Sequence, residues 1–187
     1  MPSSSPKPGA VSIDRSTPWV PEQLGASFAE DRCEKVWENP EARQIVEIDF
    51  SQVSLLPLIE GGTFVCSLTQ QESDQRILNQ LKAYQGQGYI LLDAAVVVTL
   101  LKNPDSVSQA WRRMTDSDTY DESSATIRFD GSIFKLKGQA EEFVLTPFTA
   151  RGYWHFGYDQ RLPAIPQEPS VKTDILKAFT AAIKRSE

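Results

Sequence analysis

The stretch ATIRFDGSIFKLKG, residues 125–138, contains two runs of alternating apolar and polar residues on either side of Asp130-Gly131. Alternation with a period of two predicts β-strands. An Asp-Gly pair between two such runs favours a type I′ hairpin turn, because both central residues of that turn need a positive φ. The hairpin would place Ile127 opposite Phe134, and cross-strand partners share one face of the sheet. The same apolar face would hold Phe129 and Leu136.

Two later turns extend this hairpin. A turn near Gly138 sets Phe134 opposite Phe143 and Lys135 opposite Glu142, which is a favourable charge pair. The apolar face then continues from one strand to the next.

A third turn in TARG, residues 149–152, pairs Phe148 with Tyr153. All three turns preserve one apolar face, and a one-residue slip in any of them would break it. The sequence therefore predicts an α+β fold with a four-stranded antiparallel meander at about 125–161, packed against helices. The last strand adds Trp154, Phe156 and Tyr158 to the apolar face.

The opposite face of the last hairpin carries residues that this register leaves away from the core. Phe148 and Tyr153 lie there, and His155, the only histidine of the chain, lies on the same side. Exposed apolar strips mark contact surfaces, so we expect these three side chains to be partly exposed and to bind a partner. A histidine in this position could otherwise serve as a pH switch or as an acid–base group.

The N-terminal region is predicted to be an arm. Residues 1–17 are rich in Ser and Pro and have few large apolar side chains, so they are expected to be disordered. Trp19 follows between two prolines in an extended segment. It is expected to anchor the arm, either on the chain's own core or on a partner. Residues 18–162 are then a single domain.

Periodicity and capping signals predict further elements before the meander. Thr69 and Glu72 form a capping box at the start of a helix, and Asp93 is a good N-cap for a second, buried helix. The predicted strands are 43–53, 63–68 and 89–92, and the predicted helices are 70–84, 94–102 and 105–114.

The C-terminal part is predicted to leave the domain. Prolines within residues 163–169 indicate a stiff linker, and residues 170–187 are predicted to form an amphipathic helix. This helix must dock on its own chain or on another protein, because an isolated helix of this length is marginally stable. Its apolar face comprises Ile175, Leu176, Phe179, Ala182 and Ile183. Of these, Ile175, Phe179 and Ile183 are the expected partner contacts.

Composition narrows the class of protein. The chain of 187 residues has 25 acidic and 19 basic residues and a net charge of −6, which opposes binding to phosphate. No apolar run approaches the roughly 20 residues of a membrane span, so no membrane partner is expected. The start of the chain lacks the apolar core of a secretory signal. With two distant cysteines and no disulfide scaffold, a cytoplasmic location is expected.

A search for catalytic motifs leaves two alternatives open. The sequence has no phosphate-binding glycine loop and no nucleophile elbow, and no cofactor is expected. The acidic loop 116–122 could supply Asp116, Asp118 and Asp121 as metal ligands of a metal-dependent hydrolase. Alternatively, Arg and aromatic residues in WRRM, residues 111–114, and in the last strand could stack on the bases of a single-stranded nucleic acid.

Several short patches resemble a known group of proteins. SIDRSTPWVPEQLG, VEIDFSQV, GYILLDAAVVVTLL, and IRFDGSIFKL ahead of GYWHF follow one another over about residues 12–160. In this order they are similar to a group of uncharacterised bacterial hypothetical proteins, mostly from candidate-phylum bacteria. That resemblance implies no activity and no site residues. The arm, the exposed sheet face and the C-terminal helix together predict a non-catalytic interaction or assembly protein, whose partner is another protein or a second copy of the chain.

Overall fold

The structure is a computed structural model that describes residues 9–16, 33–59, 69–119, 121, 123–162 and 177–186. In this part of the chain the α+β class is confirmed, because helices pack on a seven-stranded sheet beside a separate two-stranded sheet. Several predicted features lie outside the described residues: the strand at 63–68, the linker at 163–169, Trp19 and Ile175.

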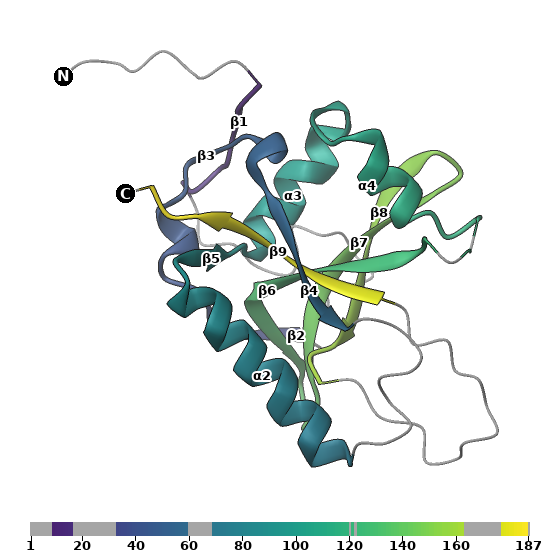
Figure 1. Ribbon diagram of the computed structural model, residues 1–187. Coiled ribbons are helices and arrows are strands. Elements are labelled where there is room, and N and C mark those ends of the chain that lie inside the picture. The colour runs from purple at the N-terminus through teal and green to yellow at the C-terminus, as the bar shows by residue number, and fades with distance from the viewer. Residues whose placement is uncertain are drawn as a thin grey trace.

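β6 (Ala125–Leu136) is the centre of the large sheet (Figure 1). The first half of β6 pairs in parallel with β9 (Lys177–Lys184), and its second half pairs with β2 (Cys33–Glu38). Its other edge pairs with β7 (Glu142–Ala150), and β8 (Tyr153–Gln160) continues the sheet beyond β7. The predicted meander is therefore present, but with three strands.

The predicted turn at Asp130-Gly131 is wrong, because β6 runs through it without interruption. The chain segment that follows β5 (Tyr89–Leu91) crosses β6 at this point. The N–H of Gly131 donates to the carbonyl oxygen of Leu92 at 2.9 Å, and a Cβ at Gly131 would overlap the backbone of Leu92. Glycine is needed here for the close approach of two backbones and not for a turn.

The next predicted turn is confirmed. Phe134 pairs with Phe143 and Lys135 pairs with Glu142, and Gly138 in the turn has a φ of 82°. The apolar face of the sheet therefore continues from β6 to β7 as the pattern indicates.

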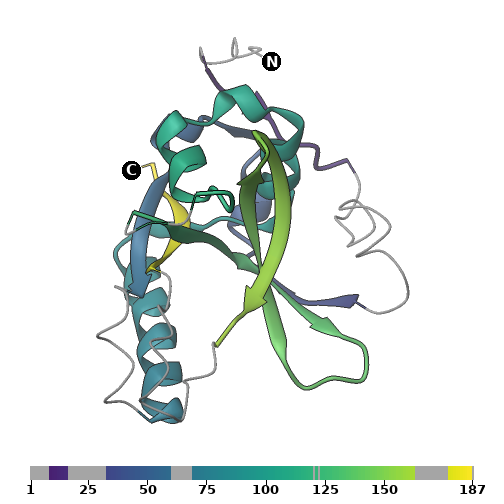
Figure 2. The same cartoon turned by 90° about the vertical axis from the view of Figure 1, so that its right-hand side faces the viewer.

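Helices cover both faces of the large sheet (Figures 1 and 2). α2 (Gln70–Gly86) packs on one face, and α3 (Ala94–Lys102) and α4 (Gln109–Met114) pack on the other. Both predicted caps are confirmed: Thr69 and Glu72 form the capping box of α2, and Asp93 accepts from the first turn of α3. α4 begins later than predicted, because 104–106 forms a separate 3₁₀ turn. No helix among the described residues is long and apolar enough to span a membrane.

β9 overturns the predicted C-terminal helix. Residues 177–184 form a strand between β4 (Ser54–Ile59) on one edge and β6 with β5 on the other. A spacing of four residues fits one face of a helix, but it also fits one face of a strand, because four is a multiple of two. Ala178 and Ala182 are 3% and 0% exposed and belong to the core beneath α2. The segment is part of the sheet and not a separate docking helix.

The expectation of a disordered arm is wrong for residues 9–16. β1 (Val11–Ser12) pairs with β3 (Glu47–Ile48), and Ile13 is 3% exposed in the main core. Only β3 of the predicted strand 43–53 pairs, because 3₁₀ turns precede and follow it.

Arg15 holds this N-terminal segment in place. Its guanidinium donates to both carboxylate oxygens of Asp93, at 2.6 and 3.3 Å, and to the carbonyl oxygens of Ala42 and Ile45. Asp93 is fully buried, so the ion pair satisfies a charge that would otherwise be strongly unfavourable in the core.

Candidate functional site

The β7–β8 hairpin closes through the two-residue turn Arg151-Gly152. Both residues have a positive φ, 51° and 79°, as a type I′ turn requires. Phe148 therefore pairs with His155 and not with Tyr153. The predicted register is wrong by two residues, but the faces are unchanged because side chains alternate with a period of two.

The outer face of this hairpin exposes the three side chains that the sequence predicts for it. Tyr153 is 73% exposed, His155 is exposed and Phe148 is partly buried. The rings of Phe148 and His155 stack, with centroids 5.5 Å apart and an interplanar angle of 24°. We call Phe148, Tyr153 and His155 the hairpin face.

Gly157 leaves room for the Phe148 ring of this stacked pair. A Cβ on Gly157 would lie 3.2 Å from the carbonyl oxygen of Thr146 and 3.4 Å from Cδ1 of Phe148. The Phe148 ring therefore lies over bare backbone, an arrangement in which an aromatic side chain covers a strand glycine. Farther along the same face, Ile133 and Val144 are 5% and 0% exposed, so only the end of the hairpin near its turn is open to solvent.

The inner face of β8 holds the hairpin on the core. Trp154 and Phe156 pack against the main core, and the Arg112 guanidinium of α4 lies 5.9 Å from the centroid of the Trp154 ring. Tyr158, which the sequence predicts on the core face, is 53% exposed and meets Phe143 edge-on at 5.2 Å. The core face of β8 thus ends before Tyr158.

The acidic loop is bonded to the turn of this hairpin. Asp118 Oδ2 accepts a hydrogen bond from the N–H of Arg151 at 2.5 Å. The N–H of Ser117 donates to the carbonyl oxygen of Thr149 at 2.8 Å, and the N–H of Thr149 donates to the carbonyl oxygen of Thr115 at 3.1 Å. These bonds stabilise the turn in which Arg151, a non-glycine residue, has a positive φ. A non-glycine residue keeps this conformation only when its surroundings stabilise it.

The other loop carboxylates bond to nearby N–H and O–H groups. Asp116 Oδ1 accepts from the N–H of Asp118 at 3.0 Å. Asp121 Oδ1 accepts from the hydroxyl and the N–H of Ser123, and these bonds lower the pKa of Asp121. Among the residues that the structure describes, no three His, Cys, Asp or Glu side chains form a group that could hold a metal ion. The geometry gives these aspartates a role in the turns.

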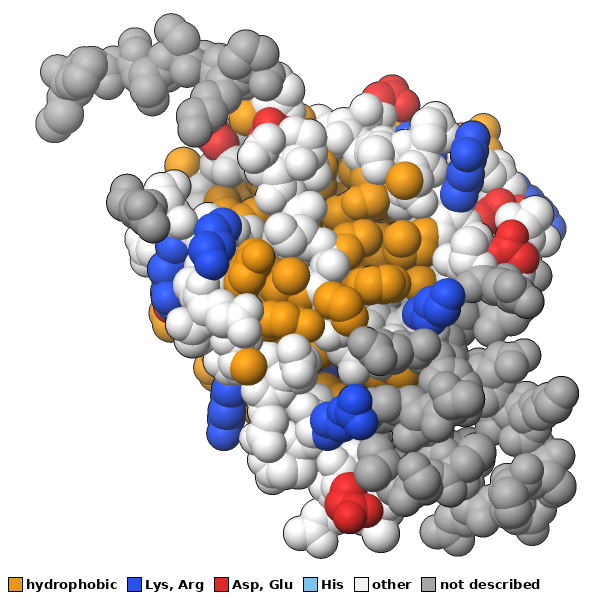
Figure 3. All heavy atoms as spheres, viewed as in Figure 1, with side chains coloured by type: hydrophobic (Ala, Val, Ile, Leu, Met, Phe, Trp, Pro, Cys, Tyr) orange, Lys and Arg blue, Asp and Glu red, His pale blue; other side chains and the backbone are white. Residues whose placement is uncertain are grey.

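Phe179 and Ile183 do not join the hairpin face. They lie on β9 beside the edge strand β4, and both are partly buried. Figure 3 shows apolar side chains gathered over β4 and β9 in the middle of this side of the molecule. We call Leu55, Pro57, Phe179 and Ile183, which lie on one face of β4 and β9, the edge patch. Pro57 is its most exposed position, and the others are partly buried.

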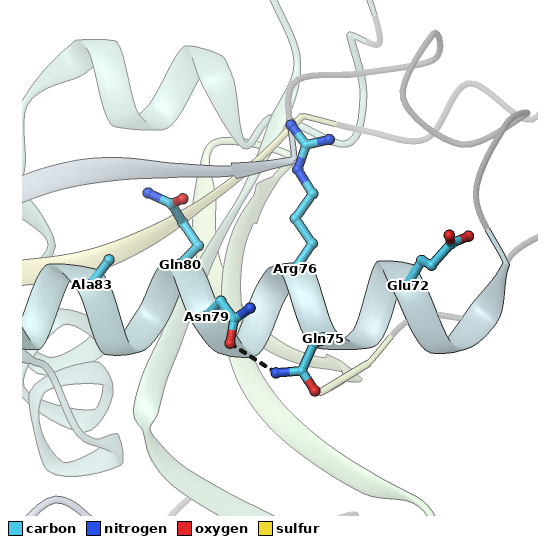
Figure 4. A pocket seen from close by; sticks show the side chains of 6 residues that line it. All are labelled: Glu72, Gln75, Arg76, Asn79, Gln80 and Ala83. Atoms are coloured by element: carbon cyan, nitrogen blue, oxygen red, sulfur yellow. Dashed lines mark hydrogen bonds between the residues drawn. The ribbon is translucent and has the colours of Figure 1, made fainter.

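A shallow hollow runs along α2, and five of its six lining residues are polar (Figure 4). Within it Gln75 Nε2 donates to Asn79 Oδ1 at 2.8 Å. Its described lining is one side of one helix and has no pair of groups arranged for acid–base chemistry. The lining residues are Glu72, Gln75, Arg76, Asn79, Gln80 and Ala83.

Sequence reasoning missed the buried ion pair of Arg128 and Asp130. Both side chains are almost completely buried, and Arg128 Nη2 lies 2.7 Å from Asp130 Oδ1. Arg128 also donates to the carbonyl oxygens of Gln160 and Arg161, at 3.4 and 2.8 Å, and so fixes the end of β8. The spacing of two residues on one strand face was the available signal, and the assumed turn at Asp130 concealed it.

No family model, no curated protein and no solved structure matches this chain. Its function is therefore inferred from the geometry of the hairpin face and its surroundings.

Proposed function

We propose that this chain is a non-catalytic protein-interaction module that binds its partner through the hairpin face. The observation that carries this proposal is the 73% exposure of Tyr153 next to the stacked rings of Phe148 and His155. Rigid aromatic side chains provide large contact area and lose little conformational entropy on binding. They are also enriched among the residues that dominate binding energy.

The surroundings favour a protein partner over a nucleic acid. The carboxylates of Asp116, Asp118 and Asp121 lie in the loop that is bonded to the hairpin turn, and the chain has a net charge of −6. In this loop and turn the three carboxylates outnumber the exposed Arg151, and net negative charge repels a phosphate backbone. A protein partner can place an apolar side chain on the rings and a basic side chain near the loop.

The contacts of His155 also fit recognition better than catalysis. A catalytic histidine is held by a hydrogen bond to a group that orients its ring. In the part of the chain that the structure describes, His155 instead lies against the Phe148 ring. Its imidazole therefore extends the aromatic surface.

The test is photo-crosslinking from the hairpin face in cells of the source organism. The photoreactive amino acid p-benzoylphenylalanine replaces Tyr153 in one variant and Val46 in a matched control. Val46 is also a large exposed apolar side chain, at 59%, but it lies outside the hairpin. We expect one defined protein adduct from position 153 and none of that mass from position 46. The same adducts from both positions, or no adduct from 153, would contradict the proposal.

A further inference from the structure

The edge patch presents side chains and not a free strand edge. Within β4, Pro57 has no N–H, and its carbonyl oxygen accepts from the Tyr84 hydroxyl at 2.6 Å. Just before β4, the N–H of Val53 donates to the carbonyl oxygen of Phe50 at 3.3 Å. Edge strands of this kind resist the addition of another strand. A partner on this surface must therefore contact the apolar side chains of the edge patch.

Basic side chains lie on several of the described sides of the edge patch. Figure 3 shows Lys and Arg side chains on several sides of the apolar area, with Asp and Glu mainly toward the periphery of this view. The exposed Lys177 and Lys184 lie at the two ends of β9. Lys184 Nζ donates to the carbonyl oxygen of Gln87 and lies 4.6 Å from the centroid of the Tyr89 ring. In an isologous dimer formed through the edge patch, the basic side chains of one copy would lie against those of the other, which is unfavourable.

The hairpin face has the complementary character. It presents the exposed Tyr153 and the stacked pair of Phe148 and His155. Asp118 bonds directly to its turn, and the carboxylates of Asp116 and Asp118 outnumber the one exposed guanidinium, Arg151, of that turn. The turn and the edge strand β4 lie on different sides of the molecule (Figures 1 and 2), so the two surfaces of one chain do not cover each other.

We propose that the edge patch binds the hairpin face of a second copy of this chain. Tyr153 contacts Pro57 and Phe179 of the neighbouring copy, and the acidic loop faces its basic rim. The inference rests on the proposed function and names the partner as a second copy. Because two different surfaces meet, the contact is heterologous and joins copies head to tail.

The experiment uses two variants of the full chain. Tyr153→Ser removes the aromatic anchor and leaves the edge patch intact, and Pro57→Glu places a negative charge in the edge patch and leaves the hairpin face intact. Sedimentation velocity over a concentration series should show that the unmodified chain self-associates. Each variant alone should associate roughly tenfold more weakly or worse, as expected for the loss of a central contact.

The decisive sample is an equimolar mixture of the two variants. In a head-to-tail contact, the hairpin face of the Pro57→Glu chain fits the edge patch of the Tyr153→Ser chain. The mixture should therefore form a dimer and no larger species. An isologous dimer would not be restored by mixing, and that result would overturn the proposal.

Two controls complete the design. Pro57→Lys also removes the proline ring but keeps the rim positive, so it should weaken association less than Pro57→Glu. Lys137→Glu changes an exposed charge in the β6–β7 turn and should leave association unchanged.

A chain that stays monomeric at all concentrations overturns the inference. If the chain is monomeric but position 153 still crosslinks to a different protein, the proposed function stands and only the inference of self-association fails.

Discussion

The backbone N–H of Gly131 donates to the carbonyl oxygen of Leu92 at 2.9 Å, where the connection from β5 to α3 crosses the central strand β6. Asn39 strengthens this crossing, because its N–H donates to the carbonyl oxygen of Gly131 and its side-chain amide donates to the carbonyl oxygen of Leu91. Two backbones meet at a distance that only glycine permits. The crossing thereby connects α3 to the sheet that carries the hairpin face.

Replacing Gly131 with Ala should therefore be strongly destabilising. The added Cβ overlaps the backbone of Leu91 and Leu92, so the crossing must shift. We expect a loss of about 3 kcal/mol in the free energy of unfolding, at the upper end of the usual range for overpacking. Urea denaturation measures it. Gly86→Ala in α2 is the matched control: a Cβ added there would meet nothing within 4 Å, so this substitution should be neutral or slightly stabilising. Equal effects of the two substitutions would refute the crossing as their cause.

Substitutions at the two central residues of the hairpin turn should change the stability of the fold in opposite directions. Arg151 has a φ of 51°, and glycine adopts this conformation without strain, so Arg151→Gly should stabilise the fold by up to about 1 kcal/mol. Gly152→Ala should destabilise it by about the same amount, because φ is 79° there. Asp118→Ala should also destabilise, since it removes the bond to the Arg151 N–H. Thermal melts of the three variants give the signs, and destabilisation by Arg151→Gly would count against a type I′ turn.

The buried pair of Arg128 and Asp130 should show strong coupling. Asp130→Ala leaves the Arg128 charge buried without its partner, and breaking such a pair typically costs about 3–5 kcal/mol. The double variant Arg128→Met with Asp130→Leu removes both charges. It should lose clearly less stability than the two single variants added together. A double-mutant cycle measured by denaturant unfolding tests this, and additive losses would show that the two side chains do not act as a pair.

Acid should weaken the attachment of the C-terminal strand through Glu41. Both oxygens of this carboxylate accept from Arg185, which follows β9, and this lowers the pKa of Glu41 below its usual 4.5. A lowered folded-state pKa stabilises the fold fully above the unfolded-state pKa, and that stabilisation is lost as the pH falls through the folded-state value. In the Glu41→Gln variant, the free energy of unfolding should therefore depend less on pH below about pH 5 than it does in the unmodified chain. A variant with the same acid dependence as the unmodified chain would exclude this contribution.

Sequence signals predicted the elements whose causes are local. The capping box of Thr69 with Glu72 and the N-cap at Asp93 depend on residues a few positions apart, and both are present. The continuity of β6 through Gly131 depends instead on the backbone of Leu92, about forty positions earlier in the chain. The residue pattern around Gly131 gives no sign of that contact. The strand at 177–184 likewise depends on open edges of β4 and β6, and its residue spacing fits a helix equally well.

The candidate site was predictable in part for a similar reason. Alternation alone places Phe148, Tyr153 and His155 on one face, and that assignment survives a register error of two residues. The stacking of Phe148 on His155 required the true register. The bond from Asp118 to Arg151 joins residues 33 positions apart, so only the folded chain shows that the acidic loop lies beside the hairpin face.

The most direct test of the interaction surface combines stability with crosslinking in one variant, Phe148→Ser with the photoreactive residue at position 153. Phe148 is partly exposed and stacks on His155 outside the core clusters. We expect the free energy of unfolding to change by about 1 kcal/mol or less, while the adduct from position 153 is lost. A fall of about 3–5 kcal/mol, as for truncation of a buried Phe, would show that this face is core. An adduct that persists at full yield would contradict the account, because binding would then not depend on the stacked rings of Phe148 and His155.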